Sequence, residues 1–338
     1  MTPQLRPRLR LVNNGDLDAL LNLAHQSGHG LTSLAADRDS LAERIEKSRS
    51  GKSRLFVLEE PENQRVVGSS GITCQVGIGE PWYSYRKETL THHSQGLGIT
   101  HNVEVLHRKL FYNGPTEVGT LFLSPSARGG GTGRFLSLAR FLYVAQFPDQ
   151  FQPEVFAEMR GVSDAAGRSP FWDAVGRHFY TLDYSDADFR SAHDKQFIAE
   201  LMPRHPIYLT LLPDAATSVV GKAHPDTQPA LHLLMQEGFQ HGDLVDIFDA
   251  GPIVTCPTQQ IRTVRDSRIW RWTTDVPADA NELWMIGNTR DTFLATFAPA
   301  RPEGDTLQIP HDVAATLDLE SGEPIRAVRL RPDYNNES

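Results

Sequence analysis

The chain has 338 residues, of which 39% are hydrophobic and 22% charged, a balance typical of a soluble globular protein with length for about two domains. Its formal net charge of −9 argues against nucleic acid and anionic membranes as partners, because both select for clustered lysine and arginine. Cys74 and Cys256 are too few cysteines for a disulfide framework, and the sequence shows neither a signal segment nor an apolar run of membrane-spanning length, so we expect a cytoplasmic protein.

The N-terminal part predicts one strand, two helices and two further strands. Residues 9–12 are typical of a strand, and a helix then begins at Asn14 or Asp16. A second helix begins at Asp37 or Asp39. Between the helices, residues 30–34 combine glycine with small hydroxyl side chains, which fits an acceptor pocket or a plain interhelical loop equally well.

Strands are then expected at residues 54–59 and 66–76, joined by a polar turn. Residues 79–115 show no clear period. They contain four histidines without the partner spacing of a metal site, so no metal is expected.

A glycine-rich loop lies between a predicted strand and a long apolar helix. The strand covers residues 118–123, and the loop holds Arg128, Gly129, Gly131 and Gly133 before the helix begins. Glycines let main-chain N–H groups approach an anion, and the first turn of a helix adds free donors and a positive dipole end. The pattern predicts a phosphate-binding site, and the alternative is a glycine-rich helix cap without a ligand.

The spacing of this loop excludes two common phosphate loops. A Rossmann loop fails because Arg134 stands where its last glycine belongs, and a Walker loop fails because no Gly-Lys-Ser/Thr closes the sequence. The residues do fit Arg-x-x-Gly-x-Gly between a strand and a helix, from Arg128 to Gly133. This resembles the pyrophosphate loop of the GNAT superfamily of coenzyme A-dependent N-acyltransferases.

Beyond the loop, residues 154–160 predict a strand, and a helix begins at Ser169 with a proline at its first position and continues to His178. Residues 179–184 are read as another strand, which completes the element order of a GNAT domain. Residues 203–213 form a proline-bounded connection, and residues 226–238 a helix.

That helix is expected to turn Leu231, Leu234 and Met235 inward, and a last apolar strand covers residues 244–248. After about residue 258 the runs become short and rich in arginine, proline and glycine. We therefore expect an acyltransferase domain over residues 1–257, with a cofactor core of about residues 1–185 completed by 186–257, and a small β-rich appendage over residues 258–338.

Longer segments resemble the arginine N-succinyltransferase family, whose members are related to GNAT proteins. The segments that carry the resemblance are residues 27–34, 81–86, 120–123, 157–161, 169–172, 197–203, 205–208, 221–225 and 245–249. The resemblance implies an α/β (α+β) fold, GNAT-like with a mixed central sheet, and transfer of succinyl from succinyl-CoA to the α-amine of L-arginine in arginine catabolism. Two alternatives are transfer to ornithine or another amino acid, and a non-catalytic CoA-binding subunit in a homo- or hetero-oligomer with a paralogous chain.

The chemistry of such a reaction fits the chain. A guanidinium stays protonated at any accessible pH, so the α-amine must be the nucleophile, and it can attack the thioester directly. By resemblance, the strand end at Leu121, Phe122 and Leu123 binds the pantetheine arm through its main chain, and its N–H groups meet the charge that develops on the thioester oxygen.

The resemblance also marks His224 as the proton donor, ahead of His178, His193 and His205. Glu117 and Glu158 are the candidates for the base, although either side chain could instead bond to Arg160 or Arg168. For the guanidinium, the candidates are Asp164, Asp173 and Glu200, among which the sequence does not choose.

Overall fold

The computed structural model describes residues 6–27, 34–60, 63–191 and 195–332. Most of the expected acceptor loop at residues 30–34, and His193, lie outside these residues. The helices are α1 (Leu17–Ser27), α2 (Arg38–Arg49), α3 (Thr132–Gln146), α4 (Pro170–Ala174), α5 (Arg177–Tyr180), α6 (Tyr184–Ser191), α7 (Gln196–Leu201), α8 (Asp214–Thr217), α9 (Gln228–Gln236), α10 (Arg262–Asp266) and α11 (His311–Thr316).

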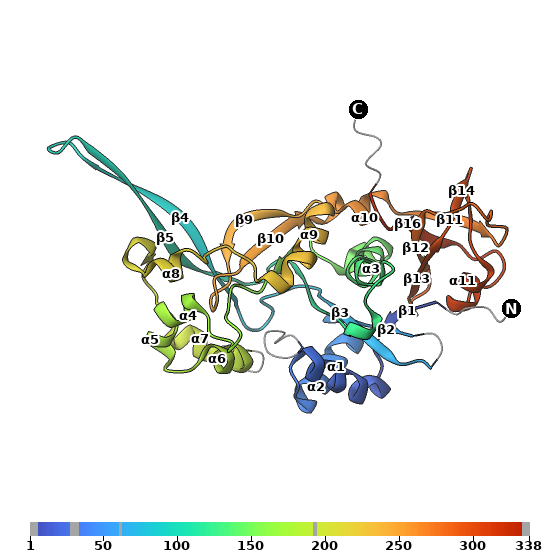
Figure 1. Cartoon of the computed structure of the whole chain (residues 1–338), viewed down its shortest axis with the longest axis horizontal. Coiled ribbons are helices and arrows are strands. Elements are labelled where there is room, and N and C mark those ends of the chain that lie inside the picture. Colours follow the sequence, from blue (N-terminus) through green and yellow to red (C-terminus); the bar gives the residue numbers. More distant parts are fainter. Residues whose placement is uncertain (1–5, 28–33, 61–62, 192–194, 333–338) are drawn as a thin grey trace.

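The strands join into one long sheet, drawn in Figure 1. They are β1 (Arg8–Leu11), β2 (Ser53–Glu59), β3 (Val66–Thr73), β4 (Trp82–Ser94), β5 (Ile99–Phe111), β6 (Thr116–Leu123), β7 (Glu154–Glu158), β8 (Ile207–Tyr208), β9 (Gln240–Val245), β10 (Pro252–Pro257), β11 (Arg268–Thr273), β12 (Leu283–Asn288), β13 (Leu294–Pro299), β14 (Arg301–Glu303), β15 (Thr306–Gln308) and β16 (Ile325–Arg329). Their order is β14-β15-β11-β16-β12-β13-β1-β2-β3-β6-β7-β10-β9-β4-β5-β8. The pairs β6–β7 and β11–β15 are parallel and the other described pairs are antiparallel, so the sheet is mixed.

The two faces of the central strands are covered by different helices. Helix α3 packs on one face, where its Phe135, Phe141 and Leu142 are fully buried against residues of β2, β6 and β7. Helices α1 and α2 pack on the other face, against Leu55 and Val57 of β2. Side chains alternate between faces along a strand, so neighbouring residues of β2 enter these two separate clusters. The glycine-rich loop lies directly before α3, at the first of these faces.

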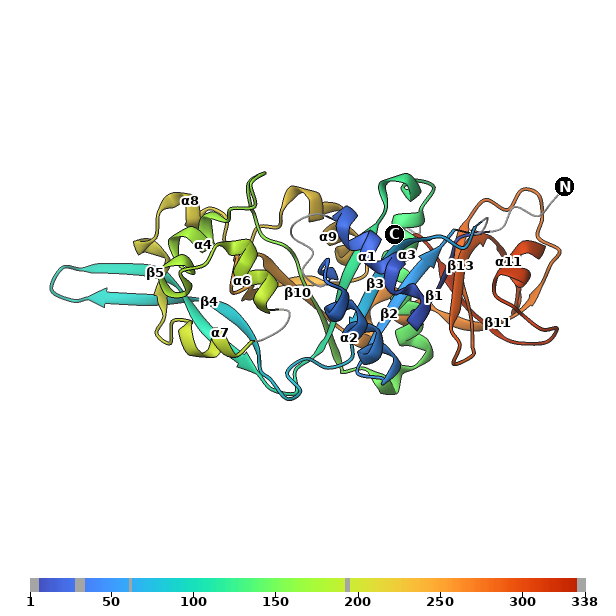
Figure 2. The same ribbon diagram turned by 90° about the horizontal axis from the view of Figure 1, so that it is seen from below.

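Strands β4 and β5 form a long hairpin that leaves the body of the molecule, as Figures 1 and 2 show. At its base, Tyr85 and Leu106 are buried with the aromatic residues of the short helices α4 to α6. The outer part of the hairpin extends beyond these helices. The stretch without a clear sequence period is therefore the longest strand pair of the described chain.

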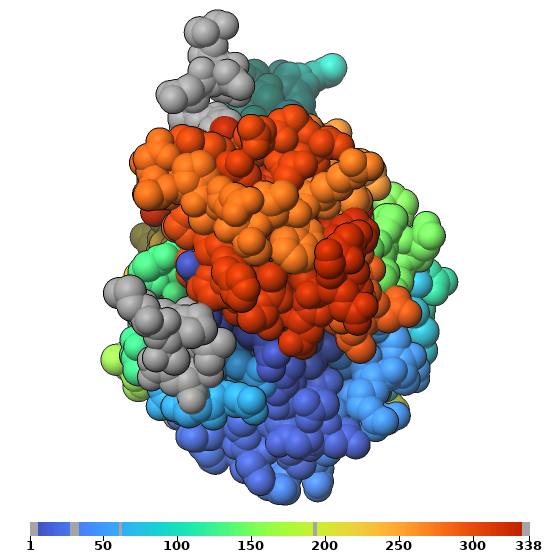
Figure 3. All heavy atoms as spheres, turned by 90° about the vertical axis from the view of Figure 1, so that its right-hand side faces the viewer, coloured from blue at the N-terminus to red at the C-terminus, as the bar shows by residue number. Residues whose placement is uncertain are grey.

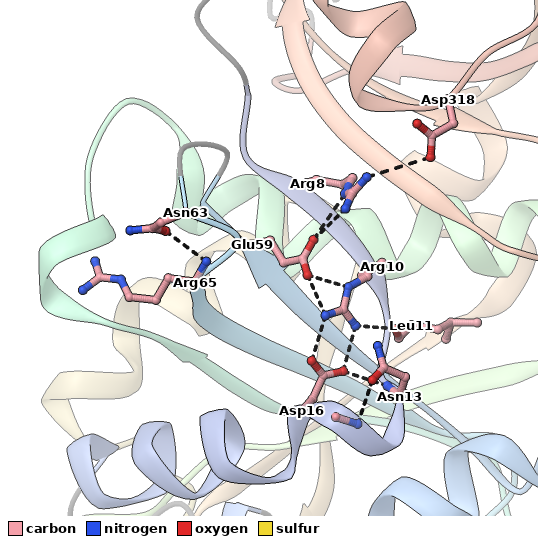
Figure 4. A network of polar contacts seen from close by, with 10 residues as sticks. Arg8, Arg10, Leu11, Asn13, Asp16, Glu59, Asn63, Arg65 and Asp318 are labelled. Atoms are coloured by element: carbon pink, nitrogen blue, oxygen red, sulfur yellow. Dashed lines mark hydrogen bonds and ion pairs between the residues drawn. The ribbon is translucent and has the colours of Figure 1, made fainter.

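The C-terminal strands continue the same sheet, because β13 pairs with β1. Figure 3 shows the C-terminal residues packed on the N-terminal ones at this end of the molecule. Figure 4 shows charged side chains next to this seam: Glu59 accepts from Arg8 and Arg10, and Arg10 also binds Asp16 at 2.7 Å. The boundary expected after residue 257 stays a prediction.

Three sequence expectations are wrong. Residues 179–184 form the end of α5, a short connection and the first residue of α6 rather than a strand. The helix from Pro170 to His178 is two short helices. Met235 is 38% exposed rather than inward.

A fourth correction concerns the last predicted strand of the first domain. Strand β9 ends at Val245, because the side chain of Asp246 accepts hydrogen bonds from the N–H groups of Phe248 and Asp249 and turns the chain. The chain then returns as β10, which sequence reasoning missed. The expected α/β class with a mixed sheet is confirmed.

Candidate active site

Strand β6 is irregular at its centre. Its register with β3 shifts between the pairs Ser69–Phe122 and Gly71–Gly119, and Thr120 at this bulge has a φ of 54°. Such an angle is uncommon for a residue other than glycine and marks a bend that its surroundings must hold. The structure therefore fixes a kink in the middle of the strand that precedes the glycine-rich loop.

Side chains from three elements hold this bulge. Ser69 Oγ donates to the carbonyl oxygen of Thr120 at 3.1 Å, and Arg44 Nη2 donates to Thr120 Oγ1 at 2.6 Å. Arg140 of α3 is only 2% exposed and donates through Nη1 to the carbonyl oxygens of Gly119, at 3.0 Å, and Gly71, at 3.4 Å. Burial lowers the pKa of Arg140 to about 10, so the guanidinium stays charged at neutral pH.

Beyond the bulge, one edge of β6 has no partner strand among the described residues. The parallel pairing of β6 with β7 covers only Thr116 and Glu117, opposite Val155 and Phe156. Residues 118–123 and 157–158 continue past the last pair, and we call these stretches the β6–β7 split. Unpaired strand edges present main-chain donors and acceptors. The predicted cofactor residues Leu121, Phe122 and Leu123 are half-buried and lie in this split.

The glycine-rich loop follows at the end of the same strand. Gly129, Gly130 and Gly131 all have positive φ, at 121°, 57° and 96°, and Gly131 is the N-cap of α3. Within the described chain, the amides of Gly131 and Gly133 have no protein acceptor. Arg128 is exposed, and only its Nε makes a contact, to the carbonyl oxygen of Leu123 at 3.4 Å. Free amides, a helix start and an unpaired arginine can hold an anion.

Carboxylates lie on the sheet face opposite α3. Glu117 is in register with Phe156 of β7, and Glu158 follows two residues later, so the three side chains share a face. Asp246 lies where β9 ends, and its N–H donates to the carbonyl oxygen of Gly251 at 2.9 Å. In the part of the chain that is described, no basic side chain forms an ion pair with Glu117, Glu158 or Asp246.

The surroundings change the ionisation of these acids. Burial raises the pKa of Glu158 well above its usual value, and the charges of Asp246 and Glu117 raise it further. Burial and the charge of Asp249 likewise raise the pKa of Asp246. The expected alternative for Glu158, a bond to Arg160 or Arg168, does not form: Arg160 donates to Ser163, and Arg168 pairs with Asp164. A carboxylate without an ion pair can act as a base, and its raised pKa makes it a stronger one.

His224 is held next to the end of β7. Its N–H donates to the carbonyl oxygen of Arg160 at 2.8 Å, and its side chain caps a short turn by accepting the N–H of Asp226 on Nδ1, at 3.1 Å. A ring nitrogen that accepts a hydrogen bond carries no proton, so in the neutral ring the proton sits on Nε2. The imidazole therefore presents a donor from Nε2.

The other candidates are placed less favourably. Asp164 pairs with Arg168, Asp173 pairs with Arg177, and Glu200 accepts from Gln196, so all three already have partners. His178 and His205 are exposed. Sequence reasoning missed Arg44, Thr120, Arg140 and Asp246. Of these, Asp246 had a visible signal, an acid inside the apolar run 244–248.

Two absences apply to the described residues only. No helix there is long and apolar enough to cross a membrane. Over the same residues, no group of three or more histidine, cysteine, aspartate or glutamate side chains is arranged to hold a metal ion.

Comparison with known proteins gives consistent matches. A family model described as the arginine N-succinyltransferase beta subunit matches residues 8–263, and a model for the C-terminal domain of that subunit matches residues 268–329. An arginine N-succinyltransferase from Enterobacter sp. (strain 638) is 39% identical over 96% of this chain and 98% of its own length. A protein named arginine N-succinyltransferase subunit beta, from Pseudomonas aeruginosa, is 40% identical over 95% of this chain and 98% of its own.

A solved structure shows the same fold. It is described as arginine/ornithine succinyltransferase subunit AI from Pseudomonas aeruginosa. It is 30% identical and covers 97% of this chain and 100% of its own, with a TM-score of 0.89.

Proposed function

The chain belongs to the arginine N-succinyltransferase family and is an acyltransferase, and from this premise we propose that it transfers succinyl from succinyl-CoA to the α-amine of L-arginine, in arginine catabolism. One observation carries the proposal. The β6–β7 split lies between a glycine-rich loop with free amides at the end of β6 and carboxylates without ion pairs on the neighbouring face. These features suit an anionic donor and a cationic acceptor.

The donor would bind along β6 and the loop that follows. The free amides of Gly131 and Gly133, the amides of Gly129 and the side chain of Arg128 suit the diphosphate of coenzyme A. The unpaired edge at residues 121–123 suits the amide groups of the pantetheine arm, which add to the sheet as a strand would. The thioester then lies within the β6–β7 split.

The proposed reaction is a direct transfer. The amine nitrogen attacks the thioester carbon, the carbonyl oxygen takes up negative charge, and the C–S bond breaks as the amide forms. N–H groups of residues 121–123 stabilise the charged oxygen. Glu158, or Glu117 beside it, takes the proton from the amine, and His224 gives a proton from Nε2 to the departing thiolate.

The acceptor would be recognised by its positive charges. Glu117, Glu158 and Asp246 form no ion pair among the described residues, so a small cation can bind them, and the guanidinium is always charged. We assign the guanidinium contact to Asp246, because it lies near Glu158 and forms no ion pair among the described residues, whereas Asp164 and Asp173 already pair with arginines. Ornithine is the second candidate acceptor, favoured by the description of the solved relative as an arginine/ornithine succinyltransferase subunit.

Thiol release by the purified chain tests the proposal. We expect turnover with succinyl-CoA and L-arginine, a specificity constant for arginine above that for ornithine, and a smaller one with acetyl-CoA. His224→Ala should lower kcat by at least about 100-fold, the usual contribution of a proton-transferring side chain, while the Kd for coenzyme A stays unchanged. His241→Ala, an exposed histidine of β9, is the control. A chain that binds coenzyme A but turns over nothing alone would establish the non-catalytic subunit instead.

A further inference from the structure

The outer part of the β4–β5 hairpin is not supported by the rest of the chain. Strand β4 pairs with β9 only at Tyr85 and Arg86, and β5 pairs with β8 only at Val105 and Leu106. We call residues 89–103, which lie beyond these pairs, the arm. Apart from Thr89, which lies opposite Glu104 of the base, the arm pairs only with itself among the described strands, from Leu90–Val103 to Ser94–Ile99, and Figures 1 and 2 show it extending from the body.

An isolated two-stranded ribbon is marginally stable in water, because it buries little apolar surface. Residues 95–102 are all exposed, and the arm tip carries Leu97, which is 75% exposed, and Ile99, which is 53% exposed. Both outer strand edges are also open. The arm is thus a regular ribbon whose apolar tip and strand edges are not covered by any other described residue.

The arm also differs from its base in charge. The base carries ion pairs across the hairpin, Lys87–Glu104 and Lys109–Glu88, each at 3.4 Å. The arm contains no aspartate, glutamate, lysine or arginine, in a chain with 22% charged residues. Proteins usually protect exposed strand edges with charges or proline, and the arm has neither.

We propose that the arm is a dimerisation element, which pairs edge to edge with the arm of a second copy of this chain. A two-fold axis places equal segments of two copies antiparallel, so each arm extends the ribbon of the other. The arms carry no formal charge, so two of them can meet without burying an unpaired charge. The rest of the chain carries the formal net charge of −9, so contacts between other parts of two copies are opposed by repulsion. The arm has 15 residues, so this contact is smaller than the roughly 20 to 30 residues that each partner of a standard interface usually contributes.

Sedimentation equilibrium of the purified full chain tests this inference, which rests on none of the proposed site residues. We expect a dimer at micromolar concentration. The double variant Leu97→Glu, Ile99→Glu should raise the dimer dissociation constant by about 100-fold or more, since it sets like charges against each other in the contact. Ile78→Glu changes a residue that is 66% exposed outside the arm, and should leave the dissociation constant unchanged.

A shortened arm removes the contact without disturbing the base. Thr91 and Asn102 are opposite each other, so replacing residues 92–101 by Asn-Gly closes the hairpin with a two-residue turn. This variant should be a monomer with an unchanged circular dichroism melting curve for the body. A wild-type monomer, including one that binds only a different subunit, would overturn the proposal, and so would a dimer that survives the shortening.

Discussion

The charged residues around Glu59 and those around Glu158 lie on the same sheet, but only the first set has opposite charges in contact. Glu59 accepts from Arg8 at 3.0 Å, Arg10 binds Glu59 and Asp16, and the set links β1, β2 and the start of α1 (Figure 4). Burial by itself lowers the pKa of Arg10, but the hydrogen bonds that Arg10 donates to Asp16 and Glu59 raise it overall, as expected for a cation with partners. Glu117, Glu158 and Asp246 have no such partner among the described residues.

The difference separates stabilisation from function. A buried charge with an opposite charge in contact stabilises the fold or costs it little free energy. Carboxylates that face one another without an ion pair lower the stability of the fold. Such an arrangement persists where a ligand supplies the missing charge. We therefore expect substitutions in the first set to lower stability and substitutions in the second to lower activity.

The largest expected effect is that of Glu158→Gln on activity. Removing a general base costs about 10²- to 10⁴-fold, so kcat/KM for arginine should fall by that factor, because the amide cannot accept the amine proton. The Kd for coenzyme A should not change. Glu154→Gln, at the exposed start of the same strand, is the matched control in the same thiol-release assay. Full activity in Glu158→Gln would leave Glu117 as the base.

Arg140 is a buried charge of a third kind, since among the described residues it donates to the carbonyl oxygens of Ser137, Gly119 and Gly71. We infer that it positions β6 at the bulge, so Arg140→Met should lower kcat by about 10- to 100-fold, as misplaced catalytic groups do, with a smaller change in KM. Arg140→Lys keeps a charge and donors and should recover part of kcat. The kcat and KM of both variants, measured by thiol release at temperatures below their melting points, separate this positioning role from a loss of folded protein.

The sequence predicted the parts of this site that depend on local pattern. The loop from Arg128 to Gly133 follows from spacing, because glycines and a helix start fix its backbone. The capping of α4 by Ser169, with proline at its first position, is likewise confirmed. Whether Glu117, Glu158 and His224 perform the roles given to them stays a prediction.

The parts that could not be predicted depend on residues far apart in the chain. The bulge at Thr120 needs Ser69, Arg44 and Arg140 to hold it, and no local pattern predicts a positive φ at threonine. The meeting of Glu158 and Asp246 depends on β10, which lies between their strands in the sheet and whose existence sequence reasoning missed. The β4–β5 hairpin has no clear period because most of its outer residues, 91–93 and 95–102, are exposed on both faces.

The smallest expected effects are on stability, and they should have opposite signs in the two sets. Glu59→Gln removes one charge from a buried ion pair and should lower the free energy of unfolding by about 2 kcal/mol. This loss is smaller than that of removing the side chain altogether, because the glutamine amide oxygen still accepts a hydrogen bond. Glu158→Gln should raise the melting temperature at pH 8, since it removes a carboxylate that its neighbours disfavour.

The pH dependence of the melting temperature tests the stabilisation predicted for Glu158→Gln. The folded state raises the pKa of Glu158, so it holds the proton to higher pH than the unfolded chain does. The stability that Glu158 contributes is complete below its unfolded pKa of about 4.3 and is lost as pH rises through the folded value. The melting temperatures of wild type and Glu158→Gln should therefore converge toward pH 4 and separate toward pH 8, with the variant higher. A separation that grows toward acid would show that Glu158 gains a cation in the folded protein, and the contrast between the two sets of charges would disappear.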